Sequence, residues 1–155
     1  MLKIGRRASC VISLVLSIII MAAIVAAAIF LPQIVTALMG VKVEIPEAAF
    51  YVKYPFILTV SYLILADAAV CDTVLLLLLL SIRRGEVFSA RTVACIRAVS
   101  WGCIAASLLF ALLTPKFYLS AAVAFVAFFV GLSLRIVKNA FEEACAIKEE
   151  NDLTV

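Results

Sequence analysis

The chain has 155 residues, is 67% hydrophobic and only 15% charged, and has a net charge of +3 and a mean hydropathy of +1.26. Soluble domains are about half apolar and about a quarter charged, so a soluble core could not absorb this much apolar surface. The composition therefore indicates an integral membrane protein. Histidine is absent, which removes the commonest metal ligand, the commonest general base and any Ser-His-Asp or Cys-His catalytic set. The five cysteines form no CxxC pair, and we expect no metal, no cofactor and no enzymatic activity.

Four segments are long and apolar enough to cross a bilayer, which needs about 20 residues of helix. They run over about 10–31, 56–82, 92–113 and 117–137. The first follows basic residues, as a signal peptide would, but its apolar run exceeds the roughly 7–15 residues of a signal peptide, so we expect it to be retained. The sequence predicts one all-α membrane domain, an antiparallel bundle of four transmembrane helices.

The basic residues predict the orientation of this bundle. If both termini are cytoplasmic, ten Lys and Arg residues lie inside and three lie outside. An excess of Lys and Arg marks the cytoplasmic side, where these residues meet anionic headgroups. The connection 32–55 is then an outer loop with a strand-like alternation over 41–45. It is either an interfacial loop or a small ordered element that binds something.

The third span carries a small residue at every fourth position. Helices in lipid associate through close packing of small residues, because burial of apolar surface gives no driving force there. The stripe therefore predicts a helix-packing face at the centre of the bundle, unless it forms a homodimer contact or is merely part of an alanine-rich span. Its members are Ala94, Ala98, Gly102 and Ala106.

The segment 138–155 continues the apolar period of the fourth span, but with charged residues between the apolar ones. We expect a helical, amphipathic extension into the cytoplasm. Its apolar stripe could dock on the bundle, on a second copy or on a partner protein. A purely solvated extension is the alternative.

Two aspartates, Asp67 and Asp72, interrupt the second span. An aspartate at the centre of a bilayer costs roughly 2.5–3.5 kcal/mol. Such residues are functional by default, but here a structural polar clamp within the bundle, a ligand or partner contact and an ion or proton pathway are all open. Five residues correspond to about 140° around a helix, so the two carboxylates face different neighbours. Arg97, about one turn into the third span, is the expected partner of Asp72, and these three residues form the predicted intramembrane polar cluster. Asp67 is expected to be protonated or to bond a hydroxyl of Ser13, Ser17 or Ser107.

Two stretches, RGEVFSARTVACIRAVSW at 84–101 and FEEACAIKEENDLTV at 141–155, resemble domain-of-unknown-function family 2975, a family of small bacterial four-span membrane proteins. Its members share a Gly-x-x-Phe-Ser element before the third span, an arginine early in that span, and an ending close to Glu-Asn-Asp-Leu-Thr-Val. The matching residues here are Gly85, Phe88, Ser89, Arg97, Glu150, Asn151, Asp152, Leu153, Thr154 and Val155.

The resemblance implies a location in the bacterial cytoplasmic membrane and no established reaction. Members are often encoded beside a small cytoplasmic helix-turn-helix regulator. This implies a non-enzymatic protein that acts through protein contacts at its cytoplasmic face and regulates such a transcription factor, without binding nucleic acid directly. The alternative is a small transporter, channel or immunity-type protein that uses Asp67 and Asp72 inside the bundle. Residues 150–155 could equally be an unstructured tail.

Overall fold

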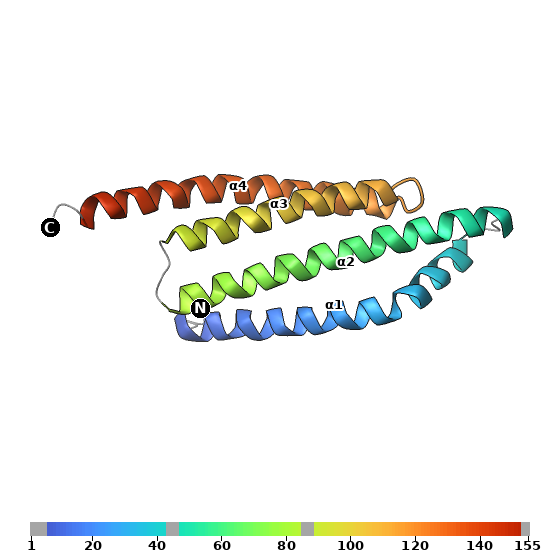
Figure 1. Ribbon diagram of the computed structural model, residues 1–155, viewed down its shortest axis with the longest axis horizontal. Helices are drawn as coiled ribbons and strands as arrows, with labels where there is room; N and C mark the ends of the chain where they lie inside the picture. The colour runs from blue at the N-terminus through green and yellow to red at the C-terminus, as the bar shows by residue number, and fades with distance from the viewer. Residues whose placement is uncertain (1–5, 43–46, 85–88, 153–155) are drawn as a thin grey trace, which may run out of the picture.

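The computed structural model describes residues 6–42, 47–84 and 89–152, all but a few of them helical. Four helices follow in order: α1 (Arg6–Lys42), α2 (Glu47–Arg83), α3 (Ala90–Leu113) and α4 (Leu119–Asp152). They run antiparallel along the long axis of the molecule (Figure 1). The start of α1, the end of α2, the start of α3 and the end of α4 lie at one end of the molecule, and the other ends of the four helices lie at the opposite end.

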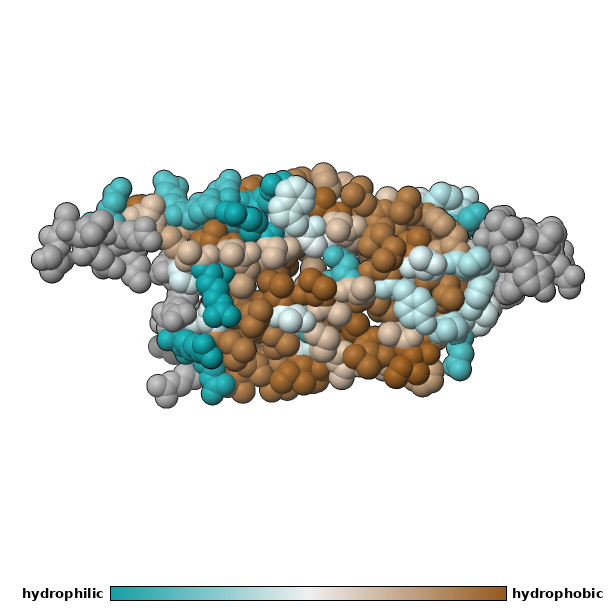
Figure 2. All heavy atoms as spheres, viewed as in Figure 1, coloured by the Kyte–Doolittle hydropathy of each residue, from teal (hydrophilic) through white to brown (hydrophobic). Residues whose placement is uncertain are grey.

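Each helix contains a segment that is long and apolar enough to cross a membrane. These segments are Val11–Leu38, Tyr54–Arg83, Ala90–Leu113 and Leu119–Ile147. On the face shown in Figure 2, hydrophobic side chains cover the middle of the molecule and hydrophilic side chains gather toward its ends. The predicted all-α membrane bundle is confirmed.

The helices pack in the order of the sequence. α1 contacts α2, α2 contacts α3, and α3 contacts α4, with α3 and α4 the most closely associated pair. Among the described residues, the backbone of α1 approaches neither α3 nor α4. Short connections favour contact between consecutive antiparallel helices. α2 and α3 therefore occupy the middle of the molecule, and α1 and α4 form its edges (Figure 1).

The predicted outer loop over 32–55 is wrong for most of its length. α1 continues through Pro32 to Lys42, and α2 already begins at Glu47 and includes Pro55. Residues 43–46, which hold the end of the strand-like alternation, lie outside the described part of the chain. Proline ends helices in water, but in a membrane helix its freed carbonyl can find another donor.

Such a donor comes from the neighbouring helix. Pro32 has no backbone N–H, so the carbonyl of Ala28, four residues earlier, loses its partner within α1. The Tyr62 hydroxyl of α2 donates a hydrogen bond to this carbonyl oxygen at 3.4 Å. Thr36 also donates its hydroxyl to the Pro32 carbonyl oxygen at 2.9 Å. The bend of α1 in its C-terminal part (Figure 1) is therefore the ordinary consequence of a proline inside a helix.

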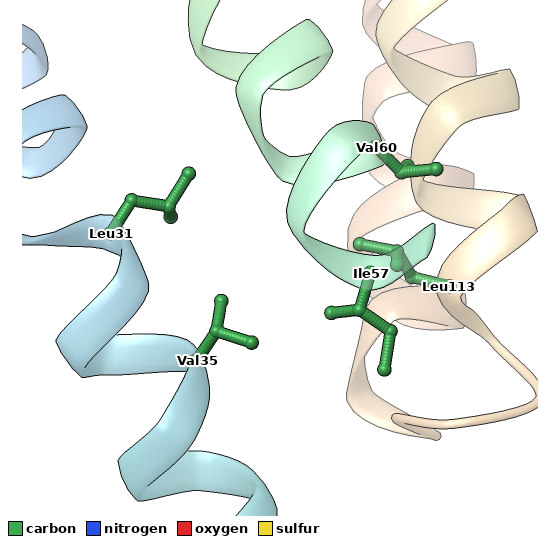
Figure 3. Close-up of a cluster of buried hydrophobic side chains, with 5 residues drawn as sticks. All are labelled: Leu31, Val35, Ile57, Val60 and Leu113. Atoms are coloured by element: carbon green, nitrogen blue, oxygen red, sulfur yellow. The ribbon is translucent and has the colours of Figure 1, made fainter. Parts of the chain in front are cut away.

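The bend brings α1 into the main apolar cluster of the molecule. Leu31 lies at the bend, and its side chain and that of Val35 extend toward α2 (Figure 3). The buried members of the cluster come from three helices and are Leu31, Val35, Ile57, Val60 and Leu113. The cluster lies at the end of the molecule opposite the two termini.

Candidate functional site

The first polar site joins α1 to α2 within their apolar segments. Asp72 of α2 is buried, with only 6% of its surface exposed, and Ser17 of α1 is 2% exposed. The Ser17 hydroxyl donates a hydrogen bond to Asp72 Oδ1 at 2.7 Å. The second carboxylate oxygen, Oδ2, is also buried and has no hydrogen-bond partner in the part of the chain that the structure describes.

The expected pair between Asp72 and Arg97 does not form. Asp72 faces α1, whereas Arg97 lies on α3 and its guanidinium contacts Glu142 of α4 instead. The spacing along the chain placed both groups near one depth in the membrane, but the rotation of each helix about its axis decides which neighbour a side chain meets. The predicted cluster of Asp67, Asp72 and Arg97 is thus divided among three helix interfaces.

Asp67 faces α3, on the other side of α2 from Asp72. Its Oδ1 lies 3.6 Å from the position that a Cβ on Gly102 would occupy. The expected bonds to Ser17 and Ser107 are not made, because Ser17 binds Asp72 and Ser107 donates to the carbonyl of Ile104 at 2.7 Å. Ser13, the third expected partner, lies on α1, whereas Asp67 faces α3. As predicted, the two aspartates therefore face different neighbouring helices.

The small residues of α3 do not form one continuous packing face. Ala94 and Ala98 are exposed, while Gly102 and Ala106 are half-buried. Gly102 lies against Cys71 of α2, so closely that a Cβ there would collide with the thiol sulfur. Only part of the predicted stripe packs inside the bundle, because α3 lies between two neighbours and uses different sides for α2 and α4. A homodimer contact through Ala94 and Ala98 stays a prediction.

The contact between α3 and α4 depends instead on Gly131. An added Cβ there would lie 3.2 Å from the carbonyl oxygen of Ser100, and the Ser100 hydroxyl donates to the Gly131 carbonyl at 2.8 Å. The absence of a side chain at Gly131 allows the two helix backbones to approach closely enough for the Ser100 hydroxyl to reach this carbonyl. The sequence signal, a glycine and a serine in two facing spans, was present but did not by itself identify the pair.

A second polar site ties α3 to the last turns of α4. Glu142 Oε1 accepts a hydrogen bond from Arg97 at 2.7 Å, and its Oε2 lies 2.6 Å from Lys138 Nζ. Nearer the middle of α4, the Arg135 guanidinium lies 4.5 Å from the centre of the Trp101 ring of α3. Both contacts join the same two helices, so the final part of α4 is fixed to α3 by charge as well as by packing.

The described residues of the family-like motif lie at the same end of the molecule. Ser89 is the N-cap of α3, and its hydroxyl accepts a hydrogen bond from the backbone N–H of Thr92 at 3.3 Å. Residues 150–152 belong to α4, so this part of the ending is helical. Four further motif residues lie outside the described residues: Gly85, Phe88, Leu153 and Thr154, together with the terminal Val155.

Comparison with known families agrees with this layout. A family model described as "Protein of unknown function (DUF2975)" matches residues 37–155, about three quarters of the chain. The chain belongs to this family. The DUF2975 match covers α2, α3 and α4 and includes Asp67, Asp72, Arg97 and Glu142, whereas nearly all of α1 precedes it. No curated protein and no solved structure gives a significant match.

Proposed function

We propose that this DUF2975 protein is a non-enzymatic protein of the bacterial cytoplasmic membrane whose two termini lie in the cytoplasm. On this proposal it acts by binding a small helix-turn-helix regulator at its inner face. The charge distribution supports the orientation, because the end that holds both termini carries Arg83, Arg84 and Arg97, whereas Lys116 lies at the other end.

The single observation that carries the proposal is the length of α4. It has 34 residues against 24 in α3, a difference of about 15 Å at the rise of an α-helix. Figure 1 shows its final turns extending beyond the ends of the other three helices. These turns carry acidic and basic residues around a residual apolar stripe, and the ion pair of Arg97 with Glu142 holds their base against α3. A rigid amphipathic helix that projects into the cytoplasm is suited to bind a soluble protein.

Co-purification tests the proposal. Deleting residues 148–155 leaves the Arg97–Glu142 contact in place and removes only the projecting turns. We expect the truncated chain to insert normally but to lose the helix-turn-helix regulator when membranes are solubilised and the protein is captured. The Tyr118→Ala variant, altered at an exposed side chain of the opposite end, should retain the regulator. Retention by the truncated chain as well would refute the proposal.

A second candidate function, transport through the bundle, is favoured by one observation. The buried Oδ2 of Asp72 lacks a hydrogen-bond partner among the described residues. A transported cation or proton could bind at this oxygen. The Asp67→Asn/Asp72→Asn double variant would then abolish ion flux into vesicles while the helical content remains unchanged. Absence of flux in the unaltered protein across common monovalent cations and protons would reject this candidate.

A further inference from the structure

At the end of the molecule away from the termini, all four helices surround a groove with a volume of about 650 Å³. Its lining includes Val35 of α1, Ile57 of α2, Leu113 of α3 and Val123 of α4. Figure 3 shows the first three of these residues, which are also buried members of the apolar cluster. Because the backbones of α1 and α4 do not contact each other in the described chain, no direct helix contact closes the groove between them.

The lining of the groove is apolar and aromatic except for Ser61 of α2 and the residues near the turn between α3 and α4. Phe110 and Phe117 contribute aromatic surface, and Lys116 is the one charged side chain among the described lining residues. The backbone N–H of Lys116 donates to the Leu113 carbonyl at 2.9 Å, which fixes the turn beside the groove. The groove is thus a mostly apolar slot with one cation in its lining, beside the turn between α3 and α4.

A slot of this kind matches an amphiphile with an acyl chain and an anionic head. Membrane helix bundles are held together by close packing, so a groove of this size forfeits contacts unless lipid fills it. We propose that the groove binds an anionic phospholipid, with an acyl chain against Phe110 and Phe117 and the headgroup phosphate at Lys116. A second copy of the chain is a poorer occupant, because it would bring another Lys116 to a groove whose described lining offers no anion.

The occupancy of the groove can be measured with a fluorescent reporter inside it. The full chain with Trp101→Phe and Phe110→Trp carries a single tryptophan in the groove and is reconstituted in phosphatidylcholine vesicles. Phosphatidylglycerol or phosphatidylcholine with brominated acyl chains is then added in increasing fractions, since bromine quenches a tryptophan that it touches. We expect phosphatidylglycerol to bind about fivefold more strongly, the effect of one basic residue near the headgroups.

Variants at the rim identify the group responsible. Lys116→Gln should remove the preference, so that the two lipids bind about equally well. Lys116→Arg should preserve it, since only the charge is required. Arg84→Gln removes the same charge at the opposite end and should leave the preference unchanged. Placing the reporter with Phe117→Trp instead guards against damage by the Phe110 substitution. The proposal fails if the parent protein shows no preference, if Lys116→Gln keeps it, or if neither brominated lipid quenches the reporter because protein fills the groove.

Discussion

Asp72 and Ser17 illustrate how one hydrogen bond accommodates an acid inside an apolar bundle. The serine hydroxyl satisfies Oδ1, and both residues are almost fully buried. Removing the hydroxyl leaves the carboxyl group with no described donor, and a buried acceptor without a partner costs about 1–3 kcal/mol. We therefore expect Ser17→Ala to lower the free energy of unfolding by roughly that amount, as measured by denaturation of the full chain in detergent micelles.

The matched control is Ser13→Ala, one turn earlier on α1. Ser13 is only half-buried, and Asp72 takes its hydrogen bond from Ser17 rather than from it. This change should alter stability by less than about 0.5 kcal/mol, as is usual away from special contacts. Equal losses for the two serines would show that the hydrogen bond contributes nothing specific.

At the scale of the helices, Gly102 sets the distance between α2 and α3. A methyl group there would collide with the Cys71 sulfur, so Gly102→Ala should force the helices apart and destabilise the protein by about 1–3 kcal/mol. Adding Cys71→Ala removes the colliding atom and should restore most of the loss. A double-mutant cycle of thermal stability measures this coupling, and strictly additive effects would contradict the contact.

The extent of the helices could be predicted from the sequence only where local properties decide it. Length and hydropathy are local, and they gave the four spans and the antiparallel order. The end of α1 was missed because Pro32 breaks a helix unless something replaces its hydrogen bond, and the replacement is Tyr62, which is 34 residues away from Ala28. The partner of Arg97 was missed for a similar reason: the rotation of α3 and α4 is set by contacts such as Ser100 with Gly131, which no single span reveals.

For the whole molecule, the arrangement in sequence order produces two ends with different characters. One end carries both termini, the basic residues at the end of α2 and the projecting turns of α4. The other carries the α3–α4 turn, the aromatic residues around it and the groove with Lys116. The proposed contact surface lies at one end and the proposed lipid site at the other, so truncating α4 and changing Lys116 alter the two separately.

The proposed regulator contact and the proposed lipid site lie on opposite sides of the membrane only if the two ends of the molecule do. This orientation can be tested by labelling single cysteines. All five native cysteines are first replaced by serine, and Tyr118→Cys or Arg84→Cys is then introduced at an exposed position at one end or the other. On intact cells, a membrane-impermeant maleimide should label the Tyr118→Cys variant and spare the Arg84→Cys variant, whereas both should react after lysis, because the basic end is retained in the cytoplasm. Labelling of the Arg84→Cys variant alone would show that the basic end faces outward, which contradicts the proposed orientation and the proposed cytoplasmic contact with a regulator. Labelling of both on intact cells would show that the chain between them does not cross the membrane an odd number of times.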